Sequence, residues 1–225
     1  MRLSSPCPSI NFKAKTIYGE PISLRDFRGT NVMLCFFRDA ACPFCNFRIY
    51  ELCNNYKEWQ QAGLEIIAVF SSTAEEVRHY VANHPRPFHL IADPDLSLYN
   101  RYGVEHSAGA LFKAITLKLP RIIKGFKTGG YPSNNPHYKI VPADFLIDTS
   151  GKVTEVWYGR DTADHIPLLQ VQRFIDRSAK QLLLDEREQR QRLQNENRQL
   201  KQLLRQIKSH YERTQAVRAT TTAKP

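Results

Sequence analysis

Two short runs of the chain are apolar at almost every position: VMLCFF at residues 32–37 and LEIIAVF at residues 64–70. Strands of this kind must be covered on both faces, because neither face carries the polar side chains that suit water. Between the runs, residues 43–61 place apolar side chains at helical spacing, and Gly63 marks the end of that helix. Strand, helix and strand in this order predict two parallel strands joined by a crossover helix.

Two hairpin patterns extend this core. Residues 10–24 alternate apolar and polar side chains around a Tyr-Gly-Glu turn, which predicts a hairpin. Residues 143–148 and 152–159 flank Thr-Ser-Gly and predict a second, antiparallel hairpin. Further short elements are expected as a helix after Ser72-Thr73, a strand within 88–95 and a helix closed by Gly103. Together these elements predict an α/β fold, with a mixed central sheet and helices on both faces.

Two regions lie outside this regular pattern. Residues 109–137 are rich in glycine and proline and are expected to form an inserted loop with one short helix. A long helix is expected from Ile166 to about Arg213. The predicted organisation is a folded domain over 1–175, a long helix over 176–215 and a disordered tail over 216–225.

The long helix carries a heptad pattern over residues 183–211. Its core positions are Leu183, Leu193, Asn197, Leu200, Leu204, Ile207 and Tyr211. Asparagine at an a position with leucine at d favours a parallel, two-stranded coiled coil, and Glu196 and Lys201 then form a favourable pair between chains. We therefore expect a homodimer through residues 183–211. The alternative is a solvated helix that packs only against its own domain.

The charge of the chain is concentrated in this tail. The net charge is +10, and residues 186–225 contribute +6 of it through ten Lys/Arg and four Glu. The segment before the heptads, LLLDEREQRQR, is mixed in charge, whereas a zipper that binds DNA needs a basic helix there. We expect no specific nucleic acid partner. No apolar run is long enough to span a membrane and no signal peptide is visible, so the expected location is the cytoplasm.

Five cysteines, an odd number, do not suggest a disulfide scaffold. Cys42 and Cys45 form a Cys-Pro-Phe-Cys motif between a buried strand and the start of a helix, where the helix dipole favours a thiolate. Pro43 fits the first turn because its missing N–H would have no partner there. Cys45 lies one turn on, so the two sulfurs can form a disulfide and exchange two electrons.

Other interpretations of these cysteines remain open. A single Cys-x-x-Cys could be half of a zinc site, although no second pair of matching spacing exists, and the two thiols could be inert core residues. We expect no cofactor and no metal. Cys35 and Cys53 are expected to be buried core residues. His165 could act as a base but is expected to be a surface or capping residue.

Several segments resemble the alkyl hydroperoxide reductase/thiol-specific antioxidant family, in its peroxiredoxin-like branch. They are residues 27–52, with an aromatic-Arg stretch before a Cys-Pro-x-Cys-Asn box, and residues 67–81, 88–104 and 142–167. The resemblance covers about residues 8–175. It implies a thioredoxin-like fold and reduction of peroxides or disulfides at Cys42. It also matches Pro142 to the family's proline that faces the active site, which is cis in thioredoxins; a plain proline at a strand start is the alternative.

The chain departs from the family where a Thr or Ser normally precedes the peroxidatic cysteine. Asp39 occupies that place, and Arg38 is the candidate for the positive charge. Asp39 could accept a proton from Cys45 or could stabilise the helix start. The expected function is peroxide reduction at Cys42 with Cys45 as resolving cysteine and a thioredoxin- or glutathione-type electron donor. The alternatives are a dithiol-disulfide reductase and a redox-sensing scaffold.

Overall fold

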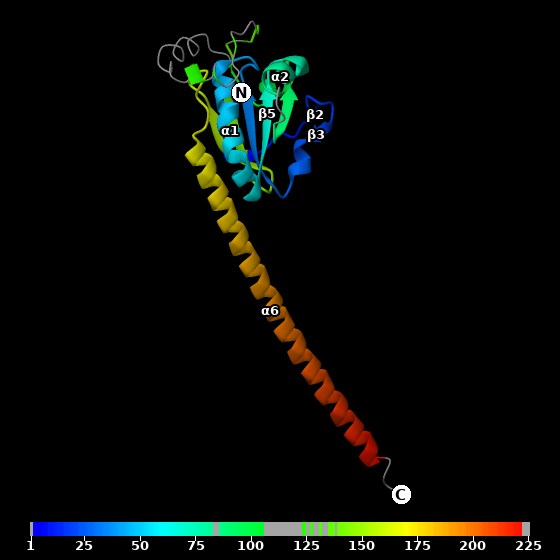
Figure 1. Ribbon diagram of the computed structural model, residues 1–225. Coiled ribbons are helices and arrows are strands. Elements are labelled where there is room, and N and C mark those ends of the chain that lie inside the picture. The colour runs from blue at the N-terminus through cyan, green and yellow to red at the C-terminus, as the bar shows by residue number, and fades with distance from the viewer. Residues whose placement is uncertain are drawn as a thin grey trace. The chain divides into compact units, whose positions relative to one another are not determined.

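The two continuous apolar runs lie side by side at the centre of a six-stranded sheet, as the sequence predicts (Figure 1). They are β4 (Asn31–Phe37) and β5 (Leu64–Phe70), paired in parallel with Phe37 opposite Phe70. The sheet order is β1-β8-β7-β4-β5-β6. The remaining strands are β1 (Cys7–Pro8), β6 (His89–Ala92), β7 (Ala143–Ile147) and β8 (Lys152–Tyr158).

The sheet is mixed because the second hairpin adds antiparallel strands to one side of β4. β7 pairs antiparallel with both β4 and β8, whereas β6 continues the parallel side next to β5. The first hairpin forms a separate two-stranded sheet of β2 (Lys13–Lys15) and β3 (Pro21–Ser23). Both predicted hairpins are therefore confirmed.

The computed structural model describes residues 2–82, 86–105, 123–124, 127, 131, 135–137 and 139–221. The insertion expected at 109–137 lies mostly outside these residues. Two compact units are present, Met1–Ser178 and Ala179–Pro225. Their boundary is three residues beyond the end of the domain expected from the sequence.

The helices begin where the sequence signals place them. α1 (Pro43–Gln61) has its proline in the first turn. α2 (Ala74–Tyr80) begins with a reciprocal capping box between Thr73 and Glu76. The other helices are η1 (Leu24–Phe27), α3 (Ser97–Arg101) and α6 (Leu168–Thr221).

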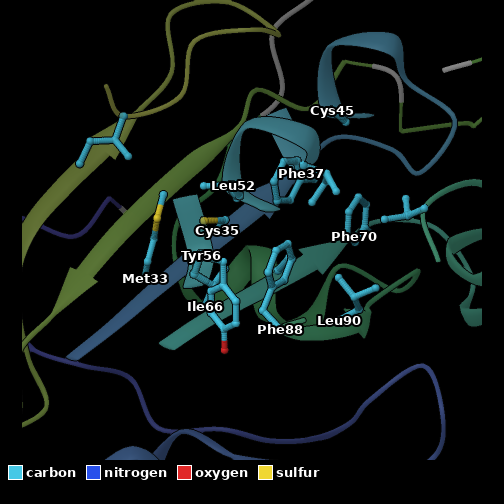
Figure 2. Close-up of a cluster of buried hydrophobic side chains, with 14 of the residues drawn as sticks. Met33, Cys35, Phe37, Cys45, Leu52, Tyr56, Ile66, Phe70, Phe88 and Leu90 are labelled. Carbon is cyan, nitrogen blue, oxygen red and sulfur yellow. The ribbon is translucent and has the colours of Figure 1, made fainter. Parts of the chain in front are cut away.

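A hydrophobic core lies on each face of the sheet. Met33, Cys35 and Phe37 point from β4 to the face covered by α1, and Figure 2 shows them with Cys45 and Leu52 of that helix. The alternate residues of β4 point to the other face, where α3 and the first hairpin cover them. This explains why β4 is apolar at every position.

α6 is longer than expected, because it runs to Thr221 and includes positions 216–221 that the sequence analysis assigned to a disordered tail. Its first turns belong to the first unit: Val171, Phe174 and Ile175 are buried, and Ser178 Oγ donates to Asn31 Oδ1 at 2.9 Å. In the second unit, every described leucine or isoleucine of the heptad core is more than half exposed. Among the described residues, no helix is long and apolar enough to cross a membrane.

Candidate active site

Cys42 lies at the N-terminal end of α1, directly after the loop that leaves β4. Its carbonyl accepts the first helical hydrogen bond, from Asn46 N at 2.9 Å. Cys45 follows one turn later. Both thiols are free, and both side chains are almost completely buried.

Cys45 and Arg38 together set the ionisation of Cys42. Nη2 of Arg38 donates a hydrogen bond to Cys42 Sγ at 2.7 Å, and Arg38 is 5 % exposed. Burial raises the pKa of Cys42, but hydrogen bonds from Cys45 and the charge of Arg38 outweigh it and lower that pKa to about 6. Cys42 is therefore a thiolate near neutral pH, the form that acts as a nucleophile.

The pKa of Cys45 is shifted in the opposite direction. Burial raises it, and the hydrogen bond to Cys42 and the negative charge there raise it further, to well above its ordinary value. The thiol of Cys45 therefore keeps its proton and donates it toward Cys42. Two cysteines three residues apart thus have unequal roles: one is ready to attack, and the other must first lose a proton.

The loop that carries Arg38 is held by buried polar residues. Asn46 Nδ2 donates to Ala40 O at 2.6 Å and to Cys42 O at 3.2 Å. Ser72 Oγ accepts from Ala40 N at 3.0 Å, and Ser71 Oγ donates to Arg38 O. None of Asn46, Ser71 and Ser72 is predicted from the sequence to belong to the site. The parallel register was the available signal, since Phe37 opposite Phe70 places Ser71 beside Arg38.

Asp39 lies within this polar shell and is 3 % exposed. Its Oδ1 accepts from Ser72 Oγ at 2.9 Å and from Ala41 N at 3.3 Å. Its Oδ2 has no hydrogen-bond partner among the described residues. The backbone N–H of Asp39 also bonds Cys45 and by itself lowers that thiol's pKa, against the larger effects above.

Pro142 precedes β7 at the end nearest the cysteine loop, because Ala143 is opposite Phe36 near the end of β4. It is buried, and its carbonyl accepts from Gly159 N at 2.9 Å. Among the described residues, the cis peptide bond is Ser5–Pro6. The bond before Pro142 is therefore trans, unlike its counterpart in thioredoxins.

The expectation for His165 was wrong. Its side chain is 5 % exposed, and Nδ1 lies 3.0 Å from both carboxylate oxygens of Asp144. Asp144 is predicted from the sequence only as part of a strand, because β7 is otherwise apolar. Its side chain points into the core beside Cys35, to which it is hydrogen bonded.

The two remaining core expectations differ in outcome. Cys35 is completely buried, as expected, whereas Cys53 is only partly buried on the outer side of the cluster. In the part of the chain that the structure describes, no three His, Cys, Asp or Glu side chains are placed to hold a metal ion.

The chain matches the model of the AhpC/TSA family over residues 6–156. It is similar to peroxiredoxin Bcp of Escherichia coli, with 24% identity over 147 residues, which are 65% of this chain and 80% of that protein. It is also similar to the thiol-disulfide oxidoreductase ResA of Halalkalibacterium halodurans, with 31% identity over 97 residues, 43% of this chain and 54% of ResA. The structure of a yeast mitochondrial 1-Cys peroxiredoxin matches with TM-score 0.56 and 16% identity, over 77% of this chain and 75% of that one.

The fold and the cysteine pair define a peroxiredoxin-like enzyme with a thioredoxin-like fold, a mixed central sheet and a long C-terminal helix. The chain belongs to the AhpC/TSA family, as its resemblance to that family indicates.

Proposed function

We propose that this protein is a thiol-dependent antioxidant oxidoreductase that reduces peroxides at Cys42, with Cys45 as the resolving cysteine. The observation that carries the proposal is the 2.7 Å hydrogen bond from Arg38 to Cys42 Sγ, next to a second thiol that keeps its proton. The similarity to peroxiredoxin Bcp supports the same reaction class.

In the first step, the Cys42 thiolate attacks one oxygen of the peroxide. The O–O bond breaks, Cys42 becomes a sulfenic acid, and the departing alkoxide takes up a proton to form an alcohol. In the second step, Cys45 loses its proton and attacks the sulfenic sulfur, which releases water and leaves a Cys42–Cys45 disulfide. A thioredoxin- or glutathione-type thiol then supplies two electrons. The yeast mitochondrial 1-Cys peroxiredoxin is described as resolved via glutathione/thioredoxin systems.

Three further residues have roles in this proposal. Arg38 stabilises the thiolate and the negative charge that develops on the peroxide oxygens. Asp39 holds the loop through Ser72 and Ala41, and its second carboxylate oxygen is buried without a hydrogen-bond partner among the described residues. Pro142 precedes β7 at the end nearest the cysteine loop, where it would help to shape the site.

A second candidate function is dithiol-disulfide exchange. It is favoured by the similarity to ResA and by the Asp39 that stands where the family places a hydroxyl. A redox sensor is a third reading of the same pair, in which oxidation alters what the helix recruits. Turnover with a thioredoxin or glutathione reducing system separates it from the enzymes, because a sensor oxidises once and recycles poorly.

The test is stopped-flow oxidation of the fully reduced protein by hydrogen peroxide, followed by mass spectrometry. Fast oxidation that yields a Cys42–Cys45 disulfide supports the peroxidase. A rate no faster than that of a free thiol eliminates it and leaves disulfide exchange or sensing. We propose a cytoplasmic location, because a reducing compartment would keep these cysteines available as thiols.

We further propose that the protein is a homodimer through residues 183–211. The support is the exposure of Leu183, Leu193, Leu200, Leu204 and Ile207, each 52 % to 62 % exposed at a heptad core position. Burying these side chains against a second copy would remove them from water, and Asn197 among them would fix a parallel, two-stranded register.

A further inference from the structure

His165 and Asp144 form a hydrogen-bonded pair on the buried face of the sheet that α1 covers. The Asp144 side chain is completely buried, and its Oδ2 also accepts from Ile166 N at 2.7 Å. This geometry resembles a carboxylate that orients an imidazole through one of its nitrogens. The peroxide chemistry proposed above gives this pair no role.

The hydrogen bonds determine which nitrogen of His165 carries a proton. Burial raises the pKa of Asp144, but His165, the charge of Arg48 and the Ile166 N–H outweigh it and hold that pKa below its usual value. An ionised carboxylate only accepts, so Nδ1–H of His165 is the donor. In the neutral imidazole, the proton on Nδ1 leaves Nε2 as the unprotonated ring nitrogen. Nε2 then carries a lone pair.

That lone pair is unused. Nε2 is buried and has no hydrogen-bond partner among the described residues. Buried polar atoms without partners are few in native proteins, and each one calls for an explanation such as a bound water or a catalytic role. Two more atoms of this kind, Asp39 Oδ2 and Asn46 Oδ1, belong to the cysteine loop and the first turn of α1. A buried water would satisfy groups of this type.

Packing contacts connect His165 to the two segments that carry the cysteine pair, the end of β4 and the start of α1. Its ring lies against Phe37, with 4.9 Å between centroids, at the end of β4 and directly before Arg38. Arg48, one turn beyond Cys45 on α1, donates to Ile166 O at 2.7 Å. Ile166 and Phe37 also belong to the same buried cluster as Cys42 and Cys45. Figure 2 shows Phe37 and Cys45 within that cluster.

We propose that His165 is the proton acceptor for the Cys45 thiol, reached through one buried water, and that Asp144 is the positioning residue that fixes its tautomer. The proposal rests on the dithiol cycle above, whichever substrate oxidises Cys42. The proton of Cys45 passes to Nε2, and the sulfur electron pair forms the bond to Cys42. The group bound to the Cys42 sulfur departs with the electron pair of the broken bond. Without a base, a thiol that keeps its proton at neutral pH would attack slowly.

An aromatic disulfide that releases a coloured thiolate tests this step without any peroxide. Cys42 attacks the reagent and releases the first thiolate; Cys45 then attacks the mixed disulfide and releases the second. In His165→Gln we expect the second release to slow by about 10²- to 10⁴-fold. The first release should keep its rate, because it needs only Cys42 and Arg38. An unchanged second release overturns the proposal.

Thr162→Val is the matched control. Thr162 lies in the same loop and is 1 % exposed, and its hydroxyl also lacks a partner among the described residues. Both releases should proceed at the wild-type rate in this variant. If Thr162→Val slows the second release as much as His165→Gln does, the effect comes from disturbance of the loop and the proposal fails.

A measurement on the wild-type protein covers the case in which His165→Gln does not fold. The nitrogen NMR shift of His165 and the rate of the second release should follow the same pH curve. The imidazole faces Asp144 of β7, which in turn interacts with Cys35 of β4 and Arg48 of α1. Asp161 and Asp164 are the titratable residues nearest to it along its own loop. Two different curves would overturn the proposal. Slow peroxide oxidation with normal releases would instead contradict only the peroxidase function.

Discussion

Arg38 Nη2 donates to Cys42 Sγ across 2.7 Å, although both side chains are buried and only three residues separate them. In a buried site this contact stabilises the thiolate more strongly than it would in water, because the dielectric constant is low. Together with the hydrogen bonds from Cys45, it compensates for the burial that would otherwise keep the Cys42 thiol protonated.

Replacing Arg38 by methionine should therefore raise the pKa of Cys42 from about 6 toward its ordinary value. At pH 7 the thiolate fraction, and with it the rate of alkylation, should fall roughly 10- to 30-fold. Thiolate absorbance measured against pH gives the pKa directly. Arg25→Met, at an exposed position, is the control and should leave the curve unchanged. A Cys42 pKa that stays near 6 in Arg38→Met would show that Arg38 is not the cause.

The serine variants of the cysteines should separate attack from resolution. Cys42→Ser should abolish activity, whereas Cys45→Ser should complete one turnover and leave a trapped adduct on Cys42, visible by mass spectrometry. Cys53→Ser is the control, because Cys53 lies on α1 but is only partly buried and outside the pair. Equal loss of activity in Cys53→Ser would contradict the assignment of Cys45.

The stability of the reduced protein should depend on pH through Cys42. Its pKa is lower in the folded state, so the stabilisation is complete above the unfolded pKa of about 8.5 and is lost as the pH falls through about 6. Between these values the unfolding free energy should rise by up to about 1.4 kcal/mol per pH unit. Urea unfolding of wild type and Cys42→Ser at several pH values measures the difference. The same slope in both proteins would exclude Cys42 as its source.

The cysteine pair and its strand and helix could be predicted because their signals are local. The apolar run before Arg38 requires a buried strand, and Pro43 after Cys42 marks a helix start. The Asp144–His165 pair could not be predicted in the same way. Asp144 lies in an apolar strand, and only the pairing of that strand with β4 shows that its side chain points into the core, toward a loop 21 residues later. Contacts of this kind depend on register, which the sequence pattern alone did not give.

Ser72→Ala should destabilise the protein by about 1–3 kcal/mol, because it leaves the buried Ala40 N–H without its acceptor and removes the hydroxyl that donates to Asp39 Oδ1. Chemical denaturation measures this change. Ser4→Ala, at an exposed position, is the control and should change the unfolding free energy by less than about 0.5 kcal/mol. A similarly small effect for Ser72→Ala would show that water replaces its hydroxyl and that the loop does not depend on it.

The heptad positions of α6 make the dimer testable without altering the redox domain. Leu200 is 56 % exposed, and the proposed register places it at a d position against its counterpart in a second copy. Leu200→Lys would bring two charges together in an apolar seam, so sedimentation should show a monomer, and peroxide oxidation of Cys42 should keep its rate. Gln199→Lys, on the outer side of the same turn, should leave the dimer intact. A wild-type protein that sediments as a monomer would instead favour a solvated helix, because the exposed leucines would then have no second copy to cover them.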